Sequence, residues 1–211
     1  MSSTLKKVRT SVGSLPLWGG ELCLDFANTV DWRNRADRKD FLADLHDLID
    51  WAVQLGAIPA DDAQCLSRNA KAFPSQAAAV FEQAIRLRET VYRIFFLMGS
   101  GAPPQAKDME EFNRIMSPLM AGAGLISSDG VRWAWTGNPG ALERLLWPIA
   151  WSAANLLASD LSSRVRECAD HACGWLFVDA SKNGKRQWCS MKGCGNRAKA
   201  RRHYQKVKPE D

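Results

Sequence analysis

Apolar side chains recur along most of this chain at intervals of three or four positions, the spacing that predicts amphipathic helices. The clearest stripe runs through residues 42–55 and stops at Gly56, a residue favoured just after a helix C-terminus. Similar stripes predict four more helices, over residues 61–73, 75–98, 107–120 and 141–158. In the second of these, the residues expected to face inward are Val80, Ala84, Leu87, Val91, Ile94 and Phe95. Pro148 lies inside the last helix and is expected to kink it.

The other segments before residue 160 are less regular. Residues 19–30 fit either a helix or a short strand, and residues 1–18 show no periodicity and are expected to form a loose arm. Asp129-Gly130, between two short apolar stretches, predicts a β-hairpin over residues 125–136. We therefore expect a mainly α N-terminal domain with a small β-hairpin over residues 1–160, and a second unit over residues 161–211.

The composition indicates a folded cytoplasmic protein. A hydrophobic content of 46% and nine tryptophans in 211 residues supply a sizeable core. Residues 1–13 carry basic residues without a following apolar run, so we expect no secretory signal. The longest uncharged apolar run, residues 145–159, is too short to cross a bilayer, and we expect no membrane association. In the cytoplasm thiols stay reduced, so clustered cysteines favour a metal over disulfides.

Positive charge is concentrated near the C-terminus. Between Asp179 and Glu210 there are ten basic residues and no acidic one, so this stretch carries a charge of +10. Since the formal net charge of the whole chain is +5, the remaining residues together carry −5. A solvated surface usually mixes the two signs. The asymmetry favours a polyanionic partner for the basic stretch.

Four of the six cysteines occur as two close pairs, Cys168 with Cys173 and Cys189 with Cys194, separated by fifteen residues. Two such pairs on neighbouring turns assemble tetrahedral sulfur ligation, so we expect one structural Zn²⁺ bound by these four residues. His171 lies inside the first pair and could replace one ligand, but four thiolates need no fifth, so we expect it at the surface.

The stretch between the cysteine pairs is expected to form a zinc-stabilised β-hairpin. Residues 174–178 and 186–189 are the predicted strands, with residues 181–184 as the turn. Trp175, Phe177 and Trp188 are expected to cover the metal and to form a small core of their own.

A basic helix is predicted after Cys194, with Asn196 as its N-cap. Ala200, Tyr204 and Val207 share one face and are expected to pack on protein. The expected nucleic-acid contacts are Lys185, Arg186, Arg197, Lys199, Arg201, Arg202 and Lys206, through phosphates and, for arginine, guanine edges. For Arg197 an equally good alternative is a hydrogen bond onto carbonyls of the zinc knuckle.

Several segments resemble a known family. The segments 166–168, 173–179, 188–191 and 194–197, the last reading Cys-Gly-Asn-Arg, closely resemble the CGNR zinc finger. Residues 24–30, with Gly20 before them, and residues 86–89 are similar to motifs of the ABATE domain that precedes this finger in bacterial proteins. The resemblance implies a stress-induced transcriptional regulator in which the four cysteines are zinc ligands.

The N-terminal domain offers polar residues at helical spacings. Asp25, Asn28, Arg33 and Arg88 could line a small-molecule pocket together with Trp32, Trp51, Trp133 or Trp135. The competing interpretation is an ion pair between Asp25 and Arg88 without a ligand. No nucleophile–base arrangement, phosphate loop or carboxylate pair stands out, so we do not expect an enzyme.

These observations favour a DNA-binding transcriptional regulator in which the N-terminal domain senses an effector or dimerises. The alternative is an RNA-binding or ribosome-associated zinc protein, which the same charge and aromatic side chains would serve. One short helix reads few base pairs, so a homodimer is expected, with residues 40–55 and 141–158 as its candidate surfaces.

Overall fold

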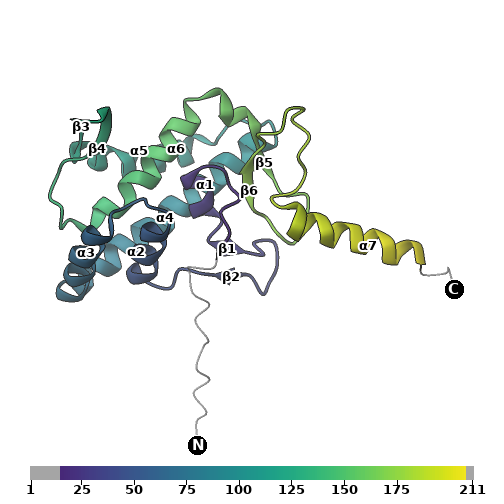
Figure 1. Ribbon diagram of the computed structural model, residues 1–211, viewed down its shortest axis with the longest axis horizontal. Helices are drawn as coiled ribbons and strands as arrows, with labels where there is room; N and C mark the ends of the chain where they lie inside the picture. Colours follow the sequence, from purple (N-terminus) through teal and green to yellow (C-terminus); the bar gives the residue numbers. More distant parts are fainter. Residues whose placement is uncertain (1–14, 208–211) are drawn as a thin grey trace, which may run out of the picture.

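The computed structural model describes residues 15–207 and shows a helical body from which one C-terminal helix projects (Figure 1). The helices are α1 (Leu22–Ala27), α2 (Leu45–Gln54), α3 (Ala60–Ala72), α4 (Pro74–Gly99), α5 (Ala106–Ala121), α6 (Trp147–Leu157) and α7 (Asn196–Val207). The strands form antiparallel pairs: β1 (Val30–Asp31) with β2 (Lys39–Asp40), β3 (Ala123–Ser128) with β4 (Gly130–Trp135), and β5 (Val165–Glu167) with β6 (Leu176–Val178). The fold class predicted from the sequence, a mainly helical chain with small hairpins and a final helix, is confirmed.

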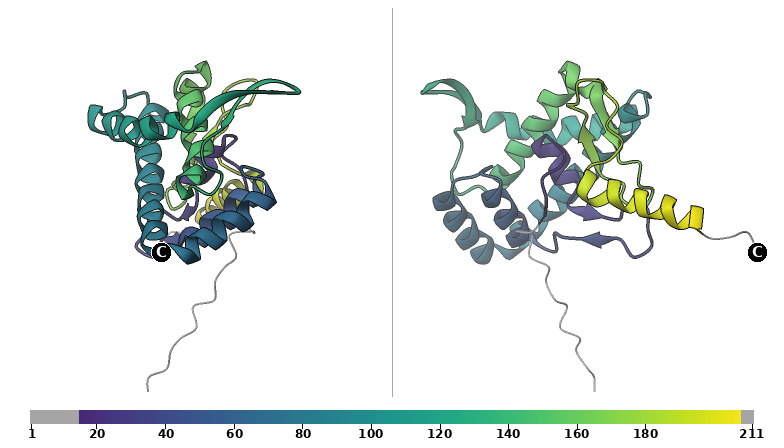
Figure 2. Two further views of the ribbon diagram at one scale, coloured as in Figure 1. Left: turned by 90° about the vertical axis from the view of Figure 1, so that its left-hand side faces the viewer. Right: turned by 45° about the vertical axis from the view of Figure 1, so that its right-hand side comes forward.

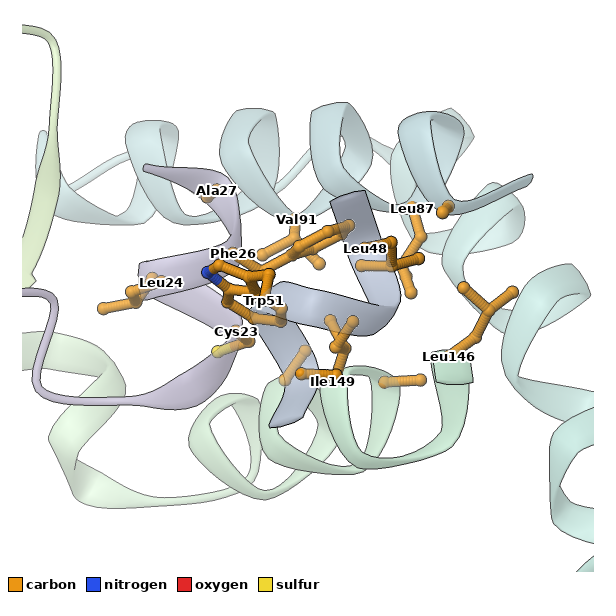
Figure 3. Packing of buried hydrophobic residues seen from close by; sticks show 14 of the residues in the cluster. Cys23, Leu24, Phe26, Ala27, Leu48, Trp51, Leu87, Val91, Leu146 and Ile149 are labelled. Carbon is orange, nitrogen blue, oxygen red and sulfur yellow. The ribbon is translucent and has the colours of Figure 1, made fainter. Parts of the chain in front are cut away.

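Helix α4 is the centre of the body. It begins at Pro74, whose missing N–H costs nothing in the first turn, and its buried face contains all six residues that the apolar pattern assigned to it. Helices α1, α2, α3 and α5 pack against it, and α6 packs on α1 and α5. Figure 3 shows Trp51 of α2 beside Phe26 of α1, with Val91 and Ile149 close by. The Phe26 and Trp51 rings lie 5.3 Å apart, centroid to centroid, so aromatic packing joins the first two helices.

The other predicted helices are confirmed with shifted ends. Helix α2 starts only after Asp44, whose carboxylate accepts the N–H groups of His46 and Asp47. The expected helix over residues 141–158 is a 3₁₀ turn, Leu142–Leu146, followed by α6. Pro148 therefore falls in the first turn of α6 and does not kink a longer helix, which corrects the prediction.

The apolar faces of α2 and α6 are both used inside the monomer. Leu48 and Trp51 of α2, and Ile149 and Ala153 of α6, are buried in the common core. These stripes are therefore not free surfaces for a second copy.

The hairpin β3–β4 stands out from the helices (Figure 2). It spans residues 123–135, and in its turn Gly130 has φ +116°, a backbone conformation that residues other than glycine rarely adopt. The Asp-Gly pair therefore located the hairpin correctly. Leu125, Val131 and Trp133 remain largely exposed on it.

The C-terminal unit is built differently from the expectation. Strand β6 pairs with β5, which precedes the first cysteine, and residues 186–189 form no strand. Among the described residues, one backbone bond, from the Ala169 N–H to the Gln187 carbonyl, holds this stretch beside the turn of the first cysteine pair. The reason is the Arg186 side chain, which donates to the carbonyls of Trp188 and Cys189 and so curls this stretch around the cysteines.

The C-terminal unit shares its core with the helices. Val165, Leu176 and Phe177 are fully buried in one cluster with residues of α1, α4 and α6, so Trp175 and Phe177 do not form a separate small core. The Asn28 amide bonds both backbone groups of Leu176, at 2.8 and 2.9 Å, and joins the end of α1 to β6. The boundary near residue 160 stays a prediction.

Residues 15–18, before α1, pack against the rest of the protein. Leu15 is buried and the Trp18 ring lies 5.7 Å from that of Trp175, so the expected loose arm is wrong for residues 15–18, while residues 1–14 lie outside the described part. Within residues 15–207 no helix is long and apolar enough to cross a membrane.

Candidate metal centre and nucleic-acid interface

The four paired cysteines converge on one point. Their sulfur atoms all lie within 4.8 Å of one another, and all four side chains are buried. The Sγ of Cys189 is 3.7 Å from that of Cys173 and 3.6 Å from that of Cys194. Zinc–thiolate bonds of about 2.3 Å in a tetrahedron place the sulfurs about 3.8 Å apart, so this spacing fits one Zn²⁺.

The chemistry of the donor set also fits a structural zinc. The contacts of Cys173 with Cys168 and then with Cys189 and Cys194 raise the pKa of its thiol, because a second negative sulfur nearby is unfavourable. A divalent cation removes that penalty and lets all four ionise. Four sulfur ligands close the coordination sphere, so the ion has a structural role.

Each cysteine pair is held by a turn. The first pair closes through the bond from the Cys173 N–H to the Asp170 carbonyl, at 2.7 Å. Gly174 follows with φ +69°, and a Cβ there would lie 2.8 Å from the Arg33 Cβ, so only glycine fits. The second pair closes through Ser190, whose hydroxyl accepts the Gly193 N–H before a single π-helical turn, Met191–Gly195.

Asn196 does not cap α7, in contrast to the prediction. It already has helical angles, φ −69° and ψ −38°, because the π-helical turn runs directly into α7. Ser190 is the capping residue of the combined segment. The second zinc knuckle and the basic helix are therefore one continuous element.

A buried acid fixes the base of α7. Asp170, between the first two cysteines, accepts hydrogen bonds from Arg197 Nε and Arg201 Nη2, both at 3.0 Å. Its carboxylate is 1% exposed; burial alone would raise its pKa, but the bonds from the two arginines outweigh this and lower it. The sequence analysis missed Asp170, although an acid between two ligands and two arginines four residues apart on a helix are visible in the sequence.

Two of the residues expected to touch nucleic acid also contact the metal centre. Arg197 also donates through Nη2 to Cys194 Sγ, at 2.9 Å, so it bonds a ligand sulfur rather than the expected carbonyls. Arg186 lies 4.3 Å over the Phe177 ring and donates to carbonyls around Cys189. Both guanidinium groups therefore direct several of their donors to the protein itself.

Beyond its first turn α7 stands free of the body (Figure 1). Ala198 is its buried contact, whereas Ala200 is exposed and Tyr204 is 71% exposed, so the predicted packing face is wrong for both. Lys199 and Arg202 are exposed and have no acidic partner among the described residues, and Lys185 is exposed on the loop after β6. Lys206 belongs to α7, but its side chain lies outside the described part.

The four residues proposed for a ligand pocket have protein partners. Arg88 pairs with Asp40 and Glu89, so the expected Asp25–Arg88 ion pair is absent from residues 15–207. Arg33 pairs with Glu89 at 2.7 Å, and Asp25 accepts the Gly19 N–H at 2.8 Å. Asn28 is hydrogen-bonded to Leu176, so these four residues connect α1, α4 and the finger. Their role in binding a ligand stays a prediction.

The aromatic residues named with them fall in three places. Trp51 is 1% exposed in the core, and Trp32 lies in the loop after β1 with φ +58°. Trp133 and Trp135, in contrast, line a cavity between β4 and α6. His171 is exposed, as expected.

Comparison with known families agrees with this arrangement. Residues 20–160 match the ABATE family, described as "Putative stress-induced transcription regulator", and residues 164–207 match the CGNR zinc finger. No curated protein matches the chain. The two matches describe a zinc-binding regulator and are not enzyme families. The chain belongs to the ABATE family and carries a CGNR zinc finger at its C-terminal end.

Proposed function

We propose that this protein is a transcriptional regulator that binds duplex DNA through α7 and the adjoining zinc finger. The observation that carries the proposal is the projecting helix itself: exposed cations on a helix that is fixed at its base and free along its length. Phosphates relieve the mutual repulsion of such cations and release counterions.

The contacts support two different roles for the basic residues in this proposal. Asp170 and the Cys194 sulfur hold Arg197 and Arg201, so these two set the direction of the helix. Lys199, Arg202 and Lys185 remain for phosphates, and Lys206 lies one further turn along α7. An α-helix that projects by its own length suits the major groove of DNA, which is about 12 Å wide.

The helical body supplies the sensor or dimerisation part of this proposal. One short helix reads only a few base pairs, so specific binding calls for two copies at a fixed spacing. Since the apolar faces of α2 and α6 are buried, a homodimer would have to use another surface of the body.

The test is a salt titration of DNA binding with a charge-neutralised variant. Lys199→Gln together with Arg202→Gln should weaken binding to duplex DNA and reduce the slope of log K against log salt by about two units, one for each phosphate that the variant no longer neutralises. Fluorescence anisotropy at several NaCl concentrations measures both quantities.

The matched control is Arg68→Gln together with Lys71→Gln, two exposed cations on α3 at the other end of the body. It removes the same charge and should leave the slope unchanged. Equal slopes for the two double variants would contradict the proposal. Tighter binding to structured RNA than to duplex DNA in the same assay would favour the RNA-binding alternative instead.

A further inference from the structure

A cavity of about 660 Å³ lies between hairpin β3–β4 and α6, at the end of the body opposite α7. Its lining includes Trp133 and Trp135 of β4, Trp147 and Trp151 of α6, and Glu21 and Leu22 at the start of α1. The volume falls within the range of about 300–1,000 Å³ that is usual for small-molecule sites. Neither the zinc centre nor the basic helix contributes to it.

The walls of the cavity are unusually aromatic. The Trp133 and Trp151 ring centroids are 5.2 Å apart, and the Trp147 and Trp151 rings stack at 5.0 Å with an interplanar angle of 26°. Trp133 remains 43% exposed on its hairpin, so it contributes little to the core. Tryptophan faces bind flat aromatic molecules well, because they combine a large apolar contact with preferred stacking geometry.

The charges around the cavity select the sign of the ligand. Arg144 is held by Asp62 and by the Pro139 carbonyl, so its charge is already matched. Arg132, on the hairpin, has no ion-pair or hydrogen-bond partner within residues 15–207. Its guanidinium fork is therefore available for a carboxylate, which it can bind with two parallel hydrogen bonds.

Glu21 is the single acidic residue of the lining and lies on the α1 side. Its charge opposes a carboxylate there, so the anionic end of a ligand faces β4 and the apolar end faces α1. The unpaired guanidinium of Arg132 disfavours an organic cation beside β4.

The α1 side of the cavity connects to the finger through one short helix. The N–H of Cys23, in α1, donates to the Ser152 hydroxyl of α6, which also lines the cavity. Helix α1 has six residues, and Asn28 directly after it bonds both backbone groups of Leu176 in β6. A molecule that presses on Glu21 and Leu22 therefore acts on the element that holds the finger strand.

We propose that this cavity binds a planar aromatic carboxylate, stacked on the tryptophans with its carboxylate on Arg132, and that binding is transmitted through α1 to the finger. The proposal rests on the regulatory function proposed above, for which it supplies the effector site. The site differs from the set Asp25, Asn28, Arg33 and Arg88, none of which lines the cavity.

The first experiment measures binding to the full-length zinc-loaded protein by calorimetry, with 2-naphthoate as the probe. Its neutral isostere 2-naphthamide and the cation 2-naphthylmethylammonium are the comparison ligands. We expect 2-naphthoate to bind at least tenfold more tightly than either, since a charge-assisted hydrogen bond contributes on the order of a factor of ten or more. Equal binding of the three ligands, or no binding at millimolar concentration, would overturn the proposal.

Variants and indole signals locate the ligand. Arg132→Gln should weaken 2-naphthoate binding about tenfold, Arg132→Lys less, and 2-naphthamide binding should not change. In ¹H–¹⁵N spectra the indole signals of Trp133, Trp147 and Trp151 should shift, while those of Trp18 and Trp175 near the zinc centre stay in place. Since Arg132 and Trp133 are exposed, Trp133→Ala should fold and lose most of the affinity. Shifts confined to Trp18 and Trp175 would place the ligand elsewhere and refute the site.

The coupling has its own readout, independent of DNA. Saturating 2-naphthoate should slow hydrogen exchange of the Leu176 amide, which bonds Asn28, by at least severalfold. Unchanged exchange at a saturated site would refute the transmission through α1. If the protein binds 2-naphthoate but no nucleic acid, the proposed function fails while the ligand site stands. If it binds DNA but not 2-naphthoate, the ligand site fails while the proposed function stands.

Discussion

Replacing Asp170 by asparagine should release α7 from the finger without removing the zinc. The carboxylate accepts one hydrogen bond from Arg197 and one from Arg201, each at 3.0 Å, and its side chain is 1% exposed. The two guanidinium groups are about half exposed, at 50% and 51%, so water replaces part of the interaction that they lose. An asparagine keeps the shape but offers neither the charge nor two acceptor oxygens.

The expected destabilisation follows from these hydrogen bonds. A hydrogen bond to a charged group contributes about 1.5–3 kcal/mol, and the solvent exposure of the arginines reduces this to about 1 kcal/mol for each bond. A total of about 2 kcal/mol corresponds to roughly a 30-fold change in the equilibrium between the docked and released helix. None of the four cysteines changes, so the zinc content should remain one per chain.

Hydrogen exchange of residues 196–205 and DNA anisotropy are the assays. Exchange in α7 should accelerate, and DNA affinity should fall by severalfold or more, although the substitution makes the protein more positive. Charge alone would strengthen binding, so a weaker complex reports that the helix is no longer held in its orientation. Asp160→Asn, an exposed carboxylate away from α7, adds the same charge and serves as the control. The reasoning is refuted if Asp170→Asn and Asp160→Asn show the same α7 exchange and the same DNA affinity.

Two other substitutions test the metal centre and the junction near α1. Cys189→Ser should lose the zinc and unfold the finger, because the ion supplies much of the folding energy of such a unit. The control Cys65→Ser should keep a full equivalent of zinc. Zinc analysis after gel filtration measures the content, and a full equivalent in Cys189→Ser would exclude Cys189 as a ligand. Burial raises the pKa of Asp25 to about 6, above its value of about 3.9 in an unfolded chain, so ionisation opposes folding and stability falls as the pH rises through this window. Between pH 5 and pH 7.5 the wild-type protein should lose roughly 1 kcal/mol relative to Asp25→Asn in urea unfolding, and a difference that does not vary with pH would contradict the shift.

The sequence by itself determined which chemistry the finger carries. Cysteine pairs at short spacing, in a stretch of ten basic and no acidic residues, identify the zinc ligands and favour a polyanionic partner without coordinates. The buried face of α4 was likewise readable, because a period of 3.6 residues over 26 positions leaves no competing interpretation. Local signals of this kind depend only on neighbouring residues.

The tertiary structure decided which partners each basic residue has. Arg186, Arg197 and Lys199 look alike in the sequence, yet the first two bond the metal centre and only the third is free along α7. The difference arises from Asp170 and from the carbonyls around Cys189, groups that folding brings within reach. Apolar periodicity cannot report such long-range partners.

The same limit applies to strands, helix ends and cavities. Strand β5 was missed because three residues carry too little pattern, and its pairing with β6 depends on burial against α4. Helix α6 begins after Leu146 because the chain enters it through a 3₁₀ turn, and the tryptophan-lined cavity exists because hairpin β3–β4 lies near α6. Neighbouring residues determine local propensity and ligand chemistry, whereas the pairing of distant segments, and with it the assignment of charges and pockets, is settled only when the whole core packs.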